Sequence, residues 1–415
     1  MYKTLVRDQL IIPHEEDYTI EFVDDSVYKI IKPEIIPFIS YPYEWCFSQL
    51  KTAALTTLRI QKLALEFDMS LKDGSAYNIQ FMAGKPLLID TLSFEKYCEG
   101  EPWIAYRQFC QHFLAPLVLM AFTDIRLNQL LRTYIDGIPL DLTSALLPFK
   151  TRLKFSVFSH IHVHAAAQKR YGDKPANKNN RKLSRTGLLA IIDNLESTIR
   201  KLQWNPGGTE WGTYYDNTNY SDEAINHKKE FICGCLDQIK PKSVWDLGAN
   251  TGVFSLLAAK RNILTISFDI DSAAVEKNYL NCLKNGEQNV LPLLLDLTNP
   301  SPSIGWENAE RMSFLERGPA DMVLALALVH HLAISNNVPL NRIAQLFSGL
   351  CKFLVIEFVP KSDSQVQRLL ATREDIFPNY TQQEFESKFT KYFAILRSTN
   401  INDSERTLYL LQKKQ

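Results

Sequence analysis

Three aspartates each mark the end of an apolar, strand-like run in the second half of the chain. Asp246 lies in SVWDL, Asp269 ends ILTISFD 23 residues later, and Asp296 follows VLPLLL. In an open parallel sheet, ligands bind in the crevice beyond the carboxyl ends of the strands. A carboxylate at Asp269 could accept hydrogen bonds from both hydroxyls of a ribose, and one at Asp296 could accept one from an adenine amine. The spacing therefore predicts a site for a nucleotide-like cofactor.

A glycine loop, DLGANTG, follows the first of these runs. Gly248 would allow a positive φ and close approach of the backbone to a ligand. Gly252 would let the next helix pack near the strand and present its N–H groups. A turn from strand to helix also uses glycine for steric reasons alone. The loop lacks the third glycine of the G-x-G-x-x-G pattern for NAD, and it lacks the G-K-[ST] of a phosphate-binding P-loop.

Alternating apolar runs and helix-like segments predict the elements that position these residues. Helices are expected at 252–260 and 272–284, and a capping box, Thr381-Gln-Gln-Glu384, begins a third. Near-continuous apolar strands between helices are typical of a parallel sheet that is covered on both faces. The expected strands are 243–247, 263–269, 290–295, 322–328 and 353–358, followed by a terminal hairpin of 392–397 and 406–411. We predict an α/β, doubly wound, Rossmann-like sheet, mostly parallel with an antiparallel last strand, and an N-terminal α+β accessory domain.

With these residues in view, 243–415 resembles the class I S-adenosylmethionine-dependent methyltransferases. The loop is similar to that family's D/E-x-G-x-G-x-G, with Asn250 at the position of the middle glycine. The resemblance implies S-adenosyl-L-methionine as the cofactor, with Asp246, Gly248, Asn250 and Gly252 around its methionine portion. It also implies that Asp269 holds the ribose and that Asp296 lies near the adenine.

The sequence is still more similar to bacterial methyltransferase-like proteins, some of them labelled nodulation-related. The similarity is carried by TEWGTYYDNTNY, LALVHHL and IEFVPKSDSQVQRLL. In the first segment, Tyr214 and Tyr220 offer flat rings that could pack against the sulfonium by cation–π contact. Packing of a helical lid against the core is the alternative interpretation of the same residues.

Two histidines and a glutamate are the candidate catalytic residues. His330 and His331 follow the fourth strand, where the methyl acceptor is expected, and imidazole titrates near neutrality. Glu357 ends the fifth strand. Each residue has a structural alternative: a histidine could cap the loop, and Glu357 could form an ion pair with Lys361 or Arg373. The chain has no Asn/Asp-Pro-Pro-aromatic sequence at the fourth strand and no cysteine at a strand end, which disfavours methylation of nucleic-acid bases. We expect an O- or N-acceptor on a small molecule.

The N-terminal region contains a weaker resemblance, to kinases of the aminoglycoside phosphotransferase group. In DMSLKDGSAYNIQFMAGKPLLID, Asp73 matches the base, and Asn78 and Asp90 match the magnesium ligands. The His-Gly that usually precedes the base is Leu71-Lys72 here, and no Gly-rich loop precedes it. A kinase-like phosphotransferase or pseudokinase domain is therefore one alternative function, and a structural hairpin with polar turns is the other interpretation. A non-catalytic, cofactor-binding interaction protein is a third possibility for the whole chain.

Composition and charge set the remaining expectations. Lys+Arg and Asp+Glu both total 46 in 415 residues, so the net charge predicts no strong affinity for nucleic acids or membranes. The seven cysteines form no disulfide or zinc pattern, which favours a cytoplasmic protein, and His160, His162 and His164 lack an acid at matching spacing for a metal. The expected organisation is a domain at 1–168, a basic linker at 169–185, a helical and aromatic connector at 186–235, and the cofactor-binding domain at 236–415.

Overall fold

The computed structural model describes residues 1–19, 27–166, 183–206, 221–371 and 373–414. The chain divides into two compact units, Met1–Asn205 and Pro206–Gln415. Most of the basic segment 169–185 lies outside the described residues, as do Tyr214 and Tyr220.

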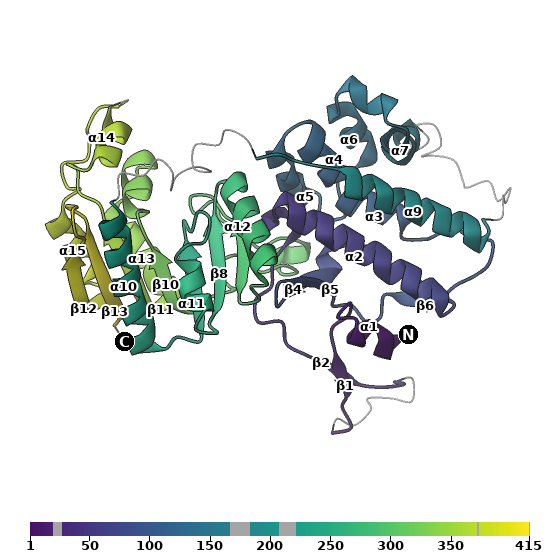
Figure 1. Ribbon diagram of the computed structural model, residues 1–415, viewed down its shortest axis with the longest axis horizontal. Coiled ribbons are helices and arrows are strands. Elements are labelled where there is room, and N and C mark those ends of the chain that lie inside the picture. Colours follow the sequence, from purple (N-terminus) through teal and green to yellow (C-terminus); the bar gives the residue numbers. More distant parts are fainter. Residues whose placement is uncertain (20–26, 167–182, 207–220, 372, 415) are drawn as a thin grey trace. The chain divides into compact units, whose positions relative to one another are not determined.

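The second unit is built on a seven-stranded sheet with the order β12-β13-β11-β10-β7-β8-β9 (Figure 1). Its strands are β7 (Ser243–Leu247), β8 (Leu264–Asp269), β9 (Val290–Leu294), β10 (Ala320–Ala325), β11 (Cys351–Phe358), β12 (Phe393–Asn400) and β13 (Thr407–Lys413). The first five are parallel to their neighbours among themselves, whereas the last strand, β13, is antiparallel to both β11 and β12. This topology confirms the predicted doubly wound, Rossmann-like α/β fold.

The strand order creates a switch point beside β7. The chain passes from β7 to β8 and β9 on one side and then returns to β10 on the other side of β7. Connections on the two sides diverge there, which opens a crevice at the carboxyl ends of β7 and β10. The predicted site residues follow the strands that border this crevice.

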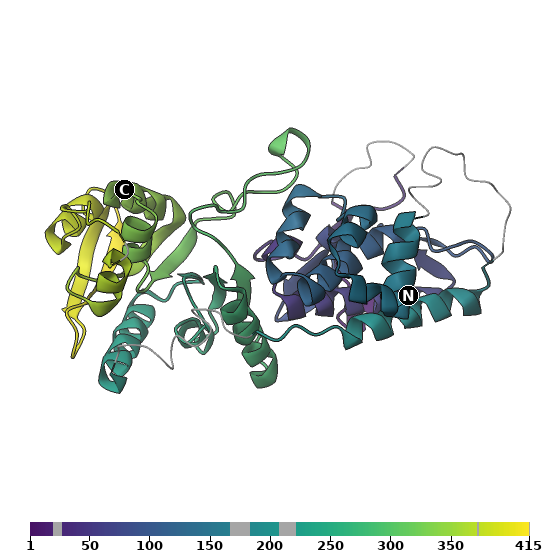
Figure 2. The same ribbon diagram turned by 90° about the horizontal axis from the view of Figure 1, so that it is seen from above.

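Helices cover both faces of this sheet. Figure 2 shows α10, α11 and α12 on one side and α13 on the other. The helices of this unit are α10 (Asp222–Ile239), α11 (Ser255–Ala259), α12 (Ser272–Asn285), α13 (Leu340–Leu350), α14 (Ser364–Leu370) and α15 (Gln382–Phe389). Phe231 and Ile232 of α10 are buried in one core cluster with Met322, Leu324 and Val355 of the central strands. This packing fixes α10 against the sheet, next to the crevice.

Helix caps fix where the loops at the crevice end. The Ser221 side chain accepts a hydrogen bond from the N–H of Ala224 and so begins α10. Asp271 caps α12 in the same way, two residues after β8, and the predicted cap Thr381 begins α15. Because each cap satisfies N–H groups that have no partner in the helix, the sequence itself sets these boundaries.

The first unit is an α+β domain, and its described residues form three two-stranded antiparallel sheets. Its strands pair as β1 (His14–Glu16) with β2 (Ile31–Pro33), β3 (Met69–Leu71) with β6 (Phe94–Lys96), and β4 (Ile79–Met82) with β5 (Lys85–Leu88). Its helices are α1 (Tyr2–Arg7), α2 (Phe47–Glu66), α3 (Tyr106–Phe109), α4 (Ala115–Phe122), α5 (Leu130–Thr133), α6 (Leu140–Leu146), α7 (Phe155–Val157) and α9 (Arg185–Lys201). The β4–β5 hairpin turns at Ala83 and Gly84, as the sequence predicts.

A continuous helical segment runs from α3 to α4 through a π-helical turn, Cys110–Leu114. Pro116 lies just after this turn and has no N–H to donate within the helix. The wider turn lets the helix continue through Pro116 into α4. Most of the residues of this helical segment are buried.

The predicted connector 186–235 is divided between the two units. Helix α9 lies along α2 in the first unit (Figure 1), and its buried Leu188, Ile192 and Leu195 share one face. Lys62 of α2 adds ion pairs with Asp193 and Glu196 of α9. Helix α10 instead belongs to the second unit. Among the described residues, no helix is long and apolar enough to cross a membrane.

Candidate cofactor and active site

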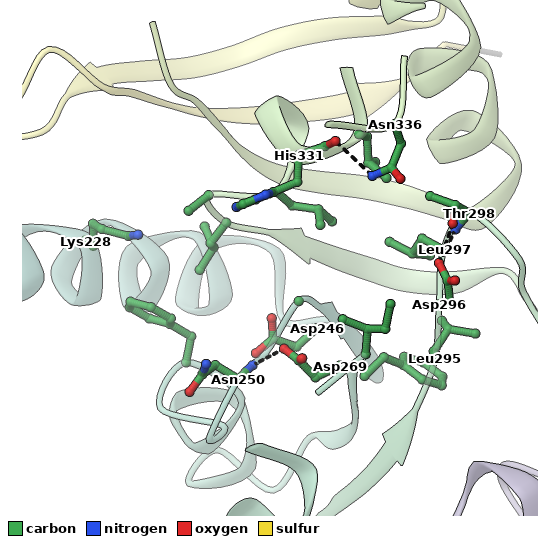
Figure 3. A pocket seen from close by; sticks show the side chains of 18 of the residues that line it. Lys228, Asp246, Asn250, Asp269, Leu295, Asp296, Leu297, Thr298, His331 and Asn336 are labelled. Carbon is green, nitrogen blue, oxygen red and sulfur yellow. Dashed lines mark hydrogen bonds between the residues drawn. The ribbon is translucent and has the colours of Figure 1, made fainter. Parts of the chain in front are cut away.

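One cavity of about 250 Å³ lies at the carboxyl ends of β7, β8, β9 and β10 (Figure 3). It is lined by Ile225, Lys228, Asp246, Gly248, Asn250, Phe254, Phe268, Asp269, Ile270, Leu295, Asp296, Leu297, Thr298, Leu326, Ala327, Leu328, His331, Leu332 and Asn336. Six of the residues proposed from the sequence are among them: Asp246, Gly248, Asn250, Asp269, Asp296 and His331. The fold therefore brings together the three strand-end acids and the glycine loop.

The glycine loop curls back onto the end of β8. The N–H groups of Gly248 and Ala249 both donate to the carbonyl oxygen of Phe268, at 2.9 Å each. Gly248 has a φ of +79° and Asn250 a φ of +51°, so both lie in the left-handed region. Asparagine is one of the few side-chain-bearing residues that adopts this region readily. Asn250 thus occupies the position of the middle glycine with a φ that asparagine tolerates.

Gly252 does not line the cavity, and its role is in packing. Its φ is +81°, and a Cβ atom there would lie 2.5–2.7 Å from the side-chain atoms of Asn278 on α12. Asn278 in turn donates to the Ser267 hydroxyl on β8 at 2.8 Å. Only glycine combines this φ with this contact, so Gly252 lets the loop pass close to α12.

Asp246 is almost fully buried at the bottom of the cavity, with 1% of its surface exposed. One carboxylate oxygen accepts a hydrogen bond from the Ser255 hydroxyl at 2.6 Å. Burial raises the pKa of Asp246 to about 7, and the nearby charge of Asp269 adds to this effect, while the Ser255 hydrogen bond opposes it. A positively charged ligand would favour the ionised form of this carboxyl.

Asp269 links the glycine loop to the start of α12. Its Oδ2 accepts the N–H of Asn250 at 2.7 Å, and its Oδ1 accepts the N–H of Asp271 at 2.8 Å. Burial nevertheless raises the pKa of Asp269 to about 6. Each carboxylate oxygen has a second lone pair, so two hydroxyl groups of one ligand can still bind.

Asp296 follows β9 and lies at one end of the cavity (Figure 3). Its Oδ1 accepts the N–H and the hydroxyl of Thr298, at 2.8 and 2.6 Å. The apolar Leu295 and Leu297 flank it and also line the cavity. A carboxylate between apolar side chains suits a flat, polar-edged ring such as a nucleobase.

The two candidate histidines have different environments. His331 lines the cavity, and burial lowers its pKa to about 4, so its imidazole is neutral at pH 7. His330 is 2% exposed and absent from the cavity lining, and its Nδ1 is a buried atom that has no hydrogen-bond partner. The two rings lie 4.2 Å apart. Only His331 can therefore reach a bound ligand directly.

Glu357 lies behind the cavity wall in a buried ion network. Its Oε2 accepts from Lys228 Nζ at 2.7 Å and from the N–H of Ala327 at 3.0 Å. Its Oε1 lies 3.4 Å from Arg406, which also forms two hydrogen bonds with Asp363. Glu357 therefore forms an ion pair, as one interpretation of the sequence expected, but its partners are Lys228 and Arg406. The expected partners bind elsewhere: Lys361 pairs with Asp375, and Arg373 donates to Ile334 and other groups.

The cavity is also lined by Lys228, Ile225 and Phe254, which were not predicted from the sequence. A signal was present, because Lys228 shares the buried face of α10 with Ala224 and Phe231. A lysine on the apolar face of a helix indicates a buried partner or a ligand. Its partner lies 129 residues away, however, and no local pattern reveals it.

The kinase-like residues of the first unit have the contacts of turn residues. Asp73 accepts from the N–H of Ser75 at 2.9 Å. Asp90 accepts from the N–H of Leu92 at 2.9 Å and from the Ser93 hydroxyl at 2.5 Å. The side-chain nitrogen of Asn78 is buried without a partner. Within the described parts of the chain, no group of three or more His, Cys, Asp or Glu side chains could hold a metal ion.

The three alternating histidines lie on a π-helical turn, Phe158–Val163, and on the residue after it. His160 contacts the hydroxyl of Tyr106 at 2.6 Å and the side chain of Asn194 at 2.9 Å. His162 contacts the hydroxyls of Ser144 and Thr151, at 2.7 and 3.0 Å. Both ring nitrogens of each histidine thus have a hydrogen-bond partner, and the two side chains connect helices of the first unit.

Comparison with solved structures gives weak likenesses that cover about half of the chain. The PH0226 protein from Pyrococcus horikoshii OT3 is 16% identical with a TM-score of 0.36, covering 50% of this chain and 100% of its own. The SAM-bound magnesium protoporphyrin IX methyltransferase (ChlM) from Synechocystis PCC 6803 is 16% identical with a TM-score of 0.33, covering 52% and 96%. Values this low assign no function.

Comparison with curated proteins gives a much stronger relationship. No protein-family model matches the sequence. The nodulation protein NoeA of Rhizobium meliloti (strain 1021) is 36% identical over 400 residues, which cover 94% of this chain and 83% of NoeA. Identity at this level along nearly the whole chain includes both units, and the chain belongs to the family of the nodulation protein NoeA.

Proposed function

We propose that the Pro206–Gln415 unit binds S-adenosyl-L-methionine and transfers its methyl group to an oxygen or nitrogen of a small molecule. The observation that carries the proposal is the convergence of three strand-end acids and the glycine loop on one cavity. Asp296 would receive the adenine amine, Asp269 the two ribose hydroxyls, and the loop from Asp246 to Asn250 the methionine portion. The family resemblance of DLGANTG supports the same assignment.

The charge of the cavity supports a cationic cofactor. Among the described residues that line it, three are aspartates and one is a lysine, which is itself paired with Glu357. A sulfonium ion is stabilised by such an environment. A dinucleotide would instead bring two phosphate charges to the loop beside Asp246 and Asp269. The electrostatics therefore favour S-adenosyl-L-methionine over NAD.

The methyl acceptor would enter beside the loop that follows β10. Leu326, Ala327, Leu328 and His331 line this side of the cavity. A neutral imidazole can take the proton of a hydroxyl as its oxygen bonds to the methyl carbon, or the proton of the ammonium that forms once a neutral amine has attacked, while S-adenosylhomocysteine leaves. We assign His331 this role. His330 and Glu357 would act indirectly, because neither lines the cavity.

Calorimetric titration with S-adenosylhomocysteine tests cofactor binding. We expect the wild type to bind it and not to bind NAD at the same concentrations. Asp269→Ala should weaken binding about 10- to 100-fold, because hydrogen bonds to a charged acceptor are lost. Asp321→Ala is the matched control: this aspartate lies in the same sheet, near the start of β10, and pairs with Lys352. Equal affinity in the wild type and Asp269→Ala would contradict the proposal.

Methyl transfer needs a separate measurement. S-adenosyl-L-methionine with a labelled methyl group, incubated with fractionated metabolites, should give a labelled product. Binding of S-adenosylhomocysteine with no transfer to any fraction would favour the alternative of a non-catalytic, cofactor-binding interaction protein. A kinase-like function of the first unit has no comparable support, since Asp73 and Asp90 both hold turns.

A further inference from the structure

Lys228 is a buried lysine that forms part of the cavity wall. Only 2% of the residue is exposed, and its Nζ lies 2.7 Å from Glu357 Oε2. The same nitrogen lies 5.0 Å from the centre of the Phe254 ring, which also lines the cavity. Burial lowers the pKa of Lys228, and the neighbouring Glu357 carboxylate opposes this by favouring the charged ammonium. Lys228 thus places an ionisable group in the cavity lining beside the apolar Ile225 and Phe254.

Stability alone gives a weak reason for this arrangement. A buried ion pair loses much of its attraction to desolvation, and apolar residues of similar volume often serve the fold as well. Lys228 lies between Ala224 and Phe231 on the buried face of α10, where an apolar side chain would continue the core. A lysine that is held here and also borders a ligand cavity points to a role in binding.

The position of Lys228 in the cavity indicates what it would bind. Figure 3 shows Lys228 and Asp296 at opposite ends, with Asp246 and Asp269 between them. On the proposed function, adenine lies at Asp296 and ribose at Asp269, so the amino-acid portion of the cofactor extends toward Lys228. That portion ends in a carboxylate, the only negative charge of the cofactor. The geometry points to Lys228 as the residue that binds this carboxylate, and this inference rests on the proposed function.

Glu357 is the positioning residue of this subsite. It accepts from both Lys228 and the backbone of Ala327, whose φ of +48° is unusual for alanine. Arg406 contacts its other oxygen and is itself held by Asp363. An ammonium group carries three donors and can bridge two carboxylates. Glu357 would thus orient Lys228 toward the cofactor and fix the loop on the acceptor side at the same time.

A comparison of two ligands on two proteins tests the inference. S-adenosylhomocysteine and its decarboxylated analogue differ only in the carboxylate. We expect the wild type to bind S-adenosylhomocysteine about 10- to 100-fold more tightly, as for hydrogen bonds to a charged group. Lys228→Met should lose this preference while it keeps its affinity for the decarboxylated analogue within about twofold. Lys229→Met, the neighbouring lysine on α10 outside the cavity lining, should behave as the wild type.

The outcomes separate this inference from the proposed function. If the wild type binds neither ligand, the proposed function is wrong and the subsite with it. If it binds both equally, or if Lys228→Met retains the preference, only the subsite is wrong. Unchanged binding with lost methyl transfer would assign Lys228 to the acceptor and would also overturn it. Lys228→Met leaves Glu357 buried without this partner, so the double variant Lys228→Met/Glu357→Gln should be measured alongside it. The comparison of the two ligands on the wild type needs no variant and tests the subsite even if these variants do not fold.

Discussion

At the scale of single residues, Asp246 shows how a site can oppose stability. Its pKa of about 7 in the folded protein lies above the 3.8 of an unperturbed aspartate. The folded state therefore binds the proton more tightly than the unfolded state does. The stabilisation that this gives is complete below pH 4 and is lost as the pH rises to 7, by about 1.4 kcal/mol per pH unit at most.

This loss of stability with rising pH predicts how Asp246→Asn affects Tm, because the asparagine side chain resembles the protonated aspartate. Without ligand, the variant should have a higher Tm than the wild type at pH 8, and the difference should shrink toward pH 5. Asp321→Asn is the opposite control: hydrogen bonds from Lys352 and Lys242 lower the pKa of Asp321 despite its burial, so this variant should be less stable at pH 8. The measurement is the Tm of each protein at pH 5 and pH 8, monitored by circular dichroism. A lower Tm for Asp246→Asn at pH 8 would contradict the expectation.

His331 is the candidate general base of methyl transfer. Its pKa of about 4 leaves the ring neutral at pH 7, although the same burial makes it a weaker base than a free imidazole. His331→Gln should lower the rate of methyl transfer about 10²- to 10⁴-fold, the usual range for loss of a general base, with unchanged affinity for S-adenosylhomocysteine. The measurement is formation of S-adenosylhomocysteine with an acceptor-containing metabolite fraction. His330→Gln should lower Tm instead, since His330 is buried outside the cavity lining. Full turnover in His331→Gln would exclude the role.

The sequence predicts some of these residues better than others. Asp246, Asp269 and Asp296 could be found because a strand end is a local feature and parallel strands bring such ends together. The role of Glu357 could not, because its partners Lys228 and Arg406 lie 129 and 49 residues away along the chain. These long-range ion pairs depend on the packing of α10 against the sheet and on the pairing of β13 within it.

At the scale of elements, the glycine loop is restricted by its neighbour α12. Gly252 has both a left-handed φ and a side chain of Asn278 where its Cβ would lie. Gly252→Ala should therefore lower Tm and weaken binding of S-adenosylhomocysteine, with a strain of about 1–3 kcal/mol from the backbone alone. Gly349→Ala on α13 is the matched control, because nothing lies within 4 Å of its Cβ position. That change should raise stability by up to about 1 kcal/mol.

Local sequence patterns were sufficient to predict the strands of the second unit. The strands of the sheet and the terminal hairpin are continuous apolar or alternating runs, and each lies within a few residues of its predicted place. The connector 186–235 was a different case, because α9 and α10 are both amphipathic and their patterns do not say what they pack against. Ion pairs from Lys62 to α9 and core packing of Phe231 on the sheet decide that.

At the level of the whole molecule, ligand binding can test whether the two compact units unfold independently of each other. Each unit has its own buried core, for example Leu117 in Met1–Asn205 and Val355 in Pro206–Gln415. We expect calorimetry to show two unfolding transitions. S-adenosylhomocysteine at 100 times its Kd should stabilise only the transition of the second unit, by about 2.7 kcal/mol.

Two variants assign the transitions. Leu117→Ala removes a fully buried side chain of α4 and should lower the transition of the first unit, by about 2–5 kcal/mol. Asp269→Ala should abolish the shift caused by S-adenosylhomocysteine without moving the first unit. If the ligand raised both transitions together, or if Leu117→Ala lowered both, the two units would unfold as one. The cofactor site would then depend on the first unit for its stability, and a role of that unit in presenting the acceptor would be the next hypothesis to test.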